Sequence, residues 1–110
     1  MLLTLLERLT LMDMLPAQES LVLMKIMHNL RMDLALSEGE IAETGLRTEP
    51  LPGQPDRVQY VWDNLGTDKE VPVGAKAQGA VVDLLEALDK DKKIEERHFS
   101  LCEKFGVGED

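Results

Sequence analysis

The sequence predicts a mainly α-helical domain that also contains a small β-hairpin, an α+β fold with about five helices and two strands. Apolar residues recur at helical spacing along most of the 110 residues. Only 4% of the residues are aromatic, so Leu, Val, Ile, Ala and six Met must build the core, and Leu, Met and Ala favour helices. One short segment instead alternates in the period of a strand.

The first half of the chain is predicted to form three helices. The sequence TLLE at residues 4–7 has the form of a capping box, and Pro16 disfavours helix at the residue before it, so the first helix is short. A second helix is expected over about residues 19–35, and its first half is apolar nearly all round, which is typical of a central, buried helix. SEGE at 37–40 is another capping box and begins a third helix over about residues 38–44.

The middle of the chain is predicted to hold a Pro-rich internal loop and the hairpin. Residues 47–57, RTEPLPGQPDR, contain three prolines and a glycine, which interrupt regular structure. We interpret them as a loop inside a single domain of residues 1–110, because neither side is long enough to fold alone. VQYVW at 58–62 is expected to be a strand, and EVPV at 70–73 its edge-strand partner, because Pro72 cannot donate a hydrogen bond to a sheet.

The last part of the chain is predicted to be helical again. A fourth helix is expected over about residues 74–89, where apolar side chains recur on one face. A fifth helix begins near Glu95, whose carboxylate suits the positive N-terminal end of a helix dipole, and it ends at Gly106. The remaining tail, residues 106–110, is expected to fray.

The charge balance argues against nucleic acid as the partner. The chain carries 12 basic and 21 acidic residues, a formal net charge of −9. Binding to phosphate requires clustered Lys and Arg, which this chain lacks, so direct DNA binding is not expected. The acidity favours protein partners, basic ones in particular, or other copies of the chain as a homo-oligomer.

The predicted order of three helices, a hairpin and a further helix is that of a winged helix, whose third helix reads DNA bases. Here, however, the third helix and the hairpin region carry carboxylates. We therefore predict that these acids form a partner-binding face, which competes with DNA for the basic cleft of a nucleic-acid-handling protein. The candidate partner-binding residues are Glu38, Glu40, Glu43, Glu49, Asp56, Asp63, Asp68 and Glu70.

The chain offers no constellation that predicts an enzyme. Its histidines are His28 and His98, and although His98 and Cys102 are four residues apart on one predicted helix, two ligands are too few for a structural zinc site. We expect no catalytic, cofactor-binding or metal-binding residues. With one cysteine, no apolar run of membrane-spanning length and no signal-peptide pattern, the sequence predicts a cytoplasmic protein without a membrane segment.

Five segments together resemble a group of small proteins of bacteriophages and prophages. They are ERLTLMDMLP (7–16), LMKIMHNLR (23–31), LSEGE (36–40), VQYVWD (58–63) and FSLCEKF (99–105). The resemblance implies a phage-associated setting in a bacterial host cell, and it brings no catalytic motif with it.

These observations lead to one functional expectation and two alternatives. We expect a non-enzymatic, acidic phage-type protein that binds another protein, as a counter-defence inhibitor with a DNA-mimic-like surface. The first alternative is a homo-oligomeric virion or assembly component, which would use Leu and Met surfaces. The second is a regulator derived from a winged helix that works through protein contacts.

Overall fold

The computed structural model describes residues 1–108, and within them it confirms the α+β class. Five α-helices accompany two antiparallel sheets of two strands each in this part of the chain. In chain order the elements are β1 (Leu2–Leu3), α1 (Leu5–Met14), α2 (Leu21–Leu34), α3 (Glu38–Thr44), β2 (Arg47–Leu51), β3 (Gln54–Val61), β4 (Lys69–Glu70), α4 (Ala75–Lys90), the 3₁₀ turn η1 (Glu96–His98) and α5 (Phe99–Phe105).

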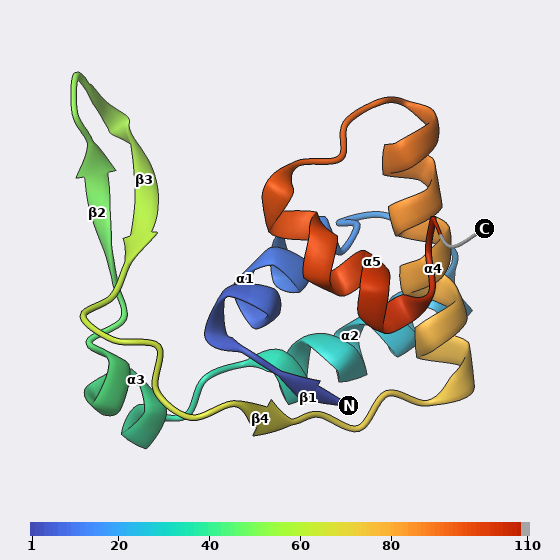
Figure 1. The fold of residues 1–110 in the computed structure, drawn as a ribbon, viewed down its shortest axis with the longest axis horizontal. Helices are drawn as coiled ribbons and strands as arrows, with labels where there is room; N and C mark the ends of the chain where they lie inside the picture. The colour runs from blue at the N-terminus through green and yellow to red at the C-terminus, as the bar shows by residue number, and fades with distance from the viewer. Residues whose placement is uncertain (109–110) are drawn as a thin grey trace.

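The helices α1, α2, α4 and α5 form a body around the hydrophobic core, and the β2–β3 hairpin projects away from this body with α3 at its base (Figure 1). The core is aliphatic, as the composition predicts. Its completely buried side chains are Leu3, Leu11, Met27, Leu34, Val71, Val81, Leu85 and Leu101. In residues 1–108, no helix is both long and apolar enough to cross a membrane.

The predicted capping boxes both form. The Thr4 side chain accepts a hydrogen bond from the Glu7 backbone N–H, and the Glu7 side chain accepts one from the Thr4 N–H. Ser37 and Glu40 make the same reciprocal pair at the start of α3. These bonds satisfy backbone donors that a helix start leaves without a partner, so α1 and α3 begin where the sequence places them.

The predicted loop at residues 47–57 is wrong, because this segment forms β2 and the first half of β3. Arg47 pairs with Val61 and Pro50 with Val58, and the strands turn at residues 52–53. Proline is tolerated here because both strands of a two-stranded sheet are edge strands, so half of their backbone N–H groups need no partner in the ladder. The Pro-Gly pair that suggested a loop is the turn of a hairpin.

The predicted pairing of residues 58–62 with 70–73 is also wrong. The first segment lies largely in β3, but its partner is β2. Lys69 and Glu70 instead pair with Leu3 and Leu2 of β1. The Val71 N–H extends this ladder by donating to the Met1 carbonyl at 2.8 Å, and the Val71 side chain is buried. This pairing is favoured because it places the Leu3 and Val71 side chains in the hydrophobic core.

The structure also differs from the sequence prediction in the burial of α2 and in the C-terminal tail. The helix α2 is not buried all round: it buries Met27, Leu30 and Leu34 on one face, but Leu21 and Val22 are exposed, because no other element covers its outer side. The tail does not fray over residues 106–108. Val107 is buried and its N–H donates to the Cys102 carbonyl at 2.9 Å, which closes the end of α5. Residues 109–110 lie outside the described residues.

The winged-helix arrangement stays a prediction. The hairpin β2–β3 does follow α3 directly, as the wing of such a fold would. The strand β1, however, pairs with β4 rather than with the hairpin, so the two small sheets are separate.

Candidate partner-binding surface

The eight acids predicted to bind a partner all lie in residues 38–70, which we call the α3–hairpin unit. This unit comprises α3, the hairpin β2–β3, the connection after it and β4, and the hairpin and α3 stand together at one side of the helical body (Figure 1). It contains eight carboxylates and three basic side chains, so it accounts for −5 of the formal net charge of −9. The unit therefore carries more than half of the net charge, although most of the 21 acids lie outside it.

Glu40 is engaged inside the protein and is not free for a partner. The Arg8 side chain is 2% exposed, and its Nη1 and Nη2 bind both carboxylate oxygens of Glu40, at 2.5 and 3.3 Å. The same guanidinium donates to the carbonyl oxygens of Leu34 at 3.1 Å and Ala35 at 2.9 Å. Arg8 therefore joins α1 to the end of α2 and the beginning of α3.

The electrostatics of Glu40 follow from this pairing. The hydrogen bond from Arg8 lowers the pKa of the Glu40 carboxyl to about 2, although partial burial acts in the opposite direction. The backbone N–H of Ser37 and the positive charges of Arg8 and Lys69 lower this pKa further. Glu40 consequently remains ionised at any pH near neutrality. Its ion pair with Arg8 holds α3 to α1 beside the end of α2.

Glu49 and Asp63 share one cation at the base of the hairpin. Arg47 Nε donates to Glu49 Oε1 at 3.2 Å, and Arg47 Nη1 donates to Asp63 Oδ1 at 3.2 Å and to the Gly45 carbonyl at 2.8 Å. The hydrogen bond from Arg47 to Asp63, followed by the one to Glu49, raises the pKa of the Arg47 guanidinium. These two carboxylates are therefore partly neutralised.

Of the other five candidate acids, one forms an ion pair and four do not. Glu70 Oε1 binds the Met1 ammonium group at 2.6 Å. Glu43 accepts a hydrogen bond from the Thr67 hydroxyl at 3.5 Å, but it pairs with no cation within residues 1–108. Of the eight candidate acids, those that form no ion pair within residues 1–108 are therefore Glu38, Glu43, Asp56 and Asp68.

The hairpin adds an apolar component that is not among the predicted partner-binding residues. Val58 and Tyr60 are 64% and 46% exposed, and they lie opposite Pro50 and Thr48, so these four side chains share one face. This face borders a cavity of about 310 Å³ that is also lined by Leu6 of α1. In the sequence, Val58, Tyr60 and Trp62 alternate with Gln59 and Val61, which predicts that they share one face of a strand.

The remaining candidate chemistry is weak. Cys102 is half-buried, and burial followed by the charge of Asp89 raises the pKa of its thiol, which disfavours the nucleophilic thiolate at neutral pH. Within residues 1–108, no group of three or more His, Cys, Asp or Glu side chains is positioned to hold a metal ion. His98 is buried, and it lines a different cavity from the one that borders the hairpin.

Comparison of this chain with models of known protein families, with curated proteins and with solved structures finds no match in any of the three.

Proposed function

We propose that this chain is a non-enzymatic protein that binds another protein through its α3–hairpin unit. The observation that supports this proposal is the hairpin itself, which projects from the body with its strands exposed to solvent (Figure 1). A two-stranded hairpin in water is marginally stable when nothing covers it. A partner that covers the face with Val58 and Tyr60 would bury apolar area and supply the missing packing.

The charges of the α3–hairpin unit define the chemistry of the partner. Glu38, Glu43, Asp56 and Asp68 carry uncompensated negative charge in the same unit, so the complementary surface is basic. Proteins that handle nucleic acid present such surfaces, and carboxylates on α3, the hairpin and the connection after it can occupy a cleft built for phosphates. We therefore propose that these four acids, rather than all eight, mimic the phosphates of DNA. A phage-associated, counter-defence role is part of the same proposal and is supported by the sequence resemblance.

A charge-reversal experiment tests the acidic component. The parent chain and the variant Glu38→Lys/Glu43→Lys/Asp56→Lys/Asp68→Lys would be used to capture proteins from nuclease-treated bacterial lysate. We expect the captured partner to fall about tenfold or more with the variant, and added DNA to displace it from the parent chain. The matched control is Asp83→Lys/Glu86→Lys/Glu96→Lys/Glu103→Lys, which changes the net charge equally outside the unit.

The two variants distinguish a specific surface from general acidity. If both reduce capture equally, overall charge and not the α3–hairpin unit determines binding. If neither reduces it, the acidic surface is not used. The variant Tyr60→Ala then tests the apolar face separately, because exposed aromatic side chains contribute disproportionately to protein interfaces.

A homo-oligomeric assembly component is the second candidate, and the outer face of α2 favours it. Leu21 and Val22 are 71% and 67% exposed, and Met32 of the same helix is exposed as well. Sedimentation of the purified chain across a range of concentrations measures its oligomeric state directly. A defined oligomer that dissociates in the variant Leu21→Lys/Val22→Lys would support an assembly role, whereas a monomer at high concentration would rule it out.

A further inference from the structure

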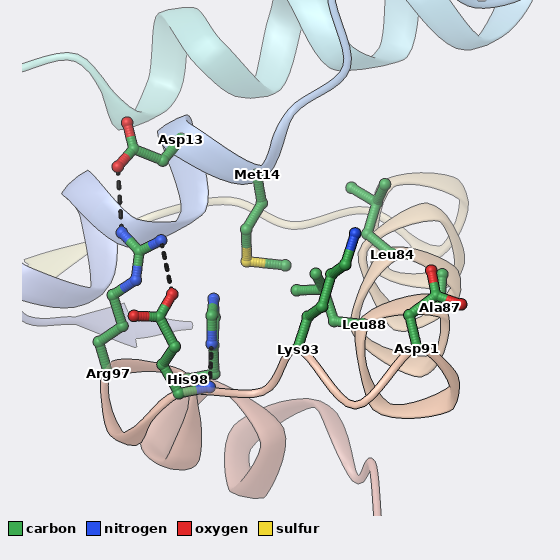
Figure 2. Close-up of a pocket in the computed structure, with 10 residues that line it drawn as sticks. Asp13, Met14, Leu84, Ala87, Leu88, Asp91, Lys93, Arg97 and His98 are labelled. Carbon is green, nitrogen blue, oxygen red and sulfur yellow. Dashed lines mark hydrogen bonds and ion pairs between the residues drawn. The ribbon is translucent and has the colours of Figure 1, made fainter.

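A cavity of about 420 Å³ lies between α1, the end of α4 and the segment that leads into α5, next to the core (Figure 2). Its apolar wall consists of Met14, Leu84 and Leu88, and its polar wall includes Arg97 and His98. The volume falls within the range of small-molecule sites, about 300–1,000 Å³. None of its polar residues belongs to the α3–hairpin unit.

His98 supplies one polar group to this cavity that forms no hydrogen bond within residues 1–108. The side chain is 2% exposed, and its Nδ1 accepts a hydrogen bond from the Glu95 backbone N–H at 2.9 Å. Every side-chain nitrogen or oxygen that is fully shielded within residues 1–108 has a hydrogen-bond partner. The His98 Nε2 has no such partner within residues 1–108, so this atom is not fully shielded, and Figure 2 shows it pointing into the space beside Met14.

The hydrogen bond to Nδ1 determines what Nε2 can do. Because the Nδ1 lone pair is occupied by the Glu95 N–H, the neutral ring carries its proton on Nε2. Burial, followed by the charge of Arg97, lowers the pKa of the imidazole, against the opposing charge of Glu95, so the neutral ring predominates at pH 7. Nε2 is therefore a hydrogen-bond donor, and it offers no lone pair to a metal ion or to a substrate proton.

The charges around the cavity determine which acceptor suits this donor. Arg97 donates to Asp13 at 3.1 Å and to Glu95 at 3.3 Å, so its charge is balanced by two carboxylates at the rim. Asp91 and Lys93 complete the charged lining, which thus contains three carboxylates and two cations. A lining with a net negative charge does not attract an anion, and a buried donor still needs an acceptor.

We propose that this cavity binds a small uncharged molecule with an apolar body and a carbonyl-type oxygen. The oxygen accepts the hydrogen bond from His98 Nε2, and the apolar body packs against Met14, Leu84 and Leu88. One directed polar contact beside an apolar wall is a usual construction of a small-molecule site. The proposal is independent of the α3–hairpin unit, so either can fail without the other.

The test uses the full chain, labelled with ¹⁵N, and three probes of one ring size: benzamide, benzoate and toluene. The imidazole resonances of His98 report binding, and those of His28, which is exposed on α2, are an internal control. We expect benzamide to shift the His98 Nε2 resonance saturably and to bind at least threefold more tightly than toluene or benzoate, with His28 unchanged. Tighter binding of benzoate, or equal binding of all three probes, would overturn the proposal.

Two variants separate the hydrogen bond from the cavity. His98→Phe keeps the ring and removes the donor, so we expect benzamide affinity to fall about three- to tenfold while toluene affinity is unchanged. Because this variant also loses the bond to Glu95, Ala87→Trp provides a second test. Ala87 is exposed on α4 and lines the cavity, and a tryptophan there occupies the cavity while His98 itself is unchanged, so all probe binding should disappear. Retained benzamide binding in both variants would place the probe elsewhere and contradict the proposal.

Discussion

Arg8 shows how one buried cation can organise several elements. Its guanidinium satisfies the carbonyls of Leu34 and Ala35, which the end of α2 leaves without helical partners, and it also holds Glu40 of α3. Such forked, charge-assisted hydrogen bonds require the planar geometry of arginine, which lysine cannot reproduce. The turn between α2 and α3 is thus set by a side chain of α1.

Replacing Arg8 with methionine is therefore expected to destabilise the fold. The change leaves two carbonyl groups and one carboxylate without their donor, and we expect the free energy of unfolding to fall by about 2–3 kcal/mol. Urea denaturation monitored by circular dichroism measures this loss. Arg57→Met is the control, because Arg57 is exposed and its contact is a long hydrogen bond of 3.4 Å to Gln54. Equal stability of the Arg8 variant and the parent would contradict the role given to this residue.

At the scale of the element, α3 depends on a glycine at its C-terminus. Gly45 has a φ of +71°, in the left-handed region that other residues adopt at a cost of about 1–2 kcal/mol. A Cβ atom at this position would also lie 2.3 Å from Asp63 Oδ2, so the Asp63 carboxylate would have to leave Arg47. The helix end and the base of the hairpin are thus coupled through one backbone conformation.

Gly45→Ala is expected to lower the free energy of unfolding by about 1–2 kcal/mol through backbone strain, with a further loss from the displaced ion pair of less than about 1 kcal/mol. The matched control is Gly106→Ala, because Gly106 ends α5 with the same φ of +71° and a Cβ there would meet no atom within 4 Å. Thermal unfolding of both variants isolates the Asp63 contact. A smaller loss in Gly45→Ala than in the control would show that Asp63 imposes no penalty.

The hairpin shows where element-level reasoning from the sequence succeeded and where it failed. The strand character of residues 58–61 is visible in the alternation of side chains, and it is confirmed in β3. The companion strand β2 is hidden by Pro50 and by the prolines at positions 52 and 55, because proline generally argues against a strand. This argument holds for a strand inside a sheet, and it loses force when both strands are edges.

At the scale of the whole molecule, the ion-paired carboxylate of Glu40 and the buried imidazole of His98 determine how the free energy of unfolding depends on pH. The pKa of Glu40 is lowered from its ordinary 4.5 to about 2, so the ionised group contributes stability that is complete above pH 4.5 and is lost as the pH falls toward 2. The pKa of His98 is lowered from 6.5, so its neutral form contributes stability above pH 6.5 that begins to be lost as the pH falls below this value.

We therefore expect the free energy of unfolding to decrease from about pH 6.5 downward and more steeply below about pH 4.5. Urea denaturation at a series of pH values measures the profile. Glu40→Gln, which keeps an acceptor for Ser37 and loses the charge, should be less stable than the parent at neutral pH and should lose less stability between pH 4.5 and 2. Parallel profiles for the two proteins would show that Glu40 does not contribute to the acid transition.

The sequence by itself determined the α+β class, the starts of α1 and α3, the ends of α3 and α5 and the concentration of acids in residues 38–70. These features depend on residues within a few positions of one another, through caps, glycine and side-chain periodicity. Only the tertiary structure decided that β4 pairs with β1, that Arg8 removes Glu40 from the exposed acids, and that His98 Nε2 faces a cavity. Those outcomes depend on contacts between distant parts of the chain, which burial of a shared core selects and which no local pattern records.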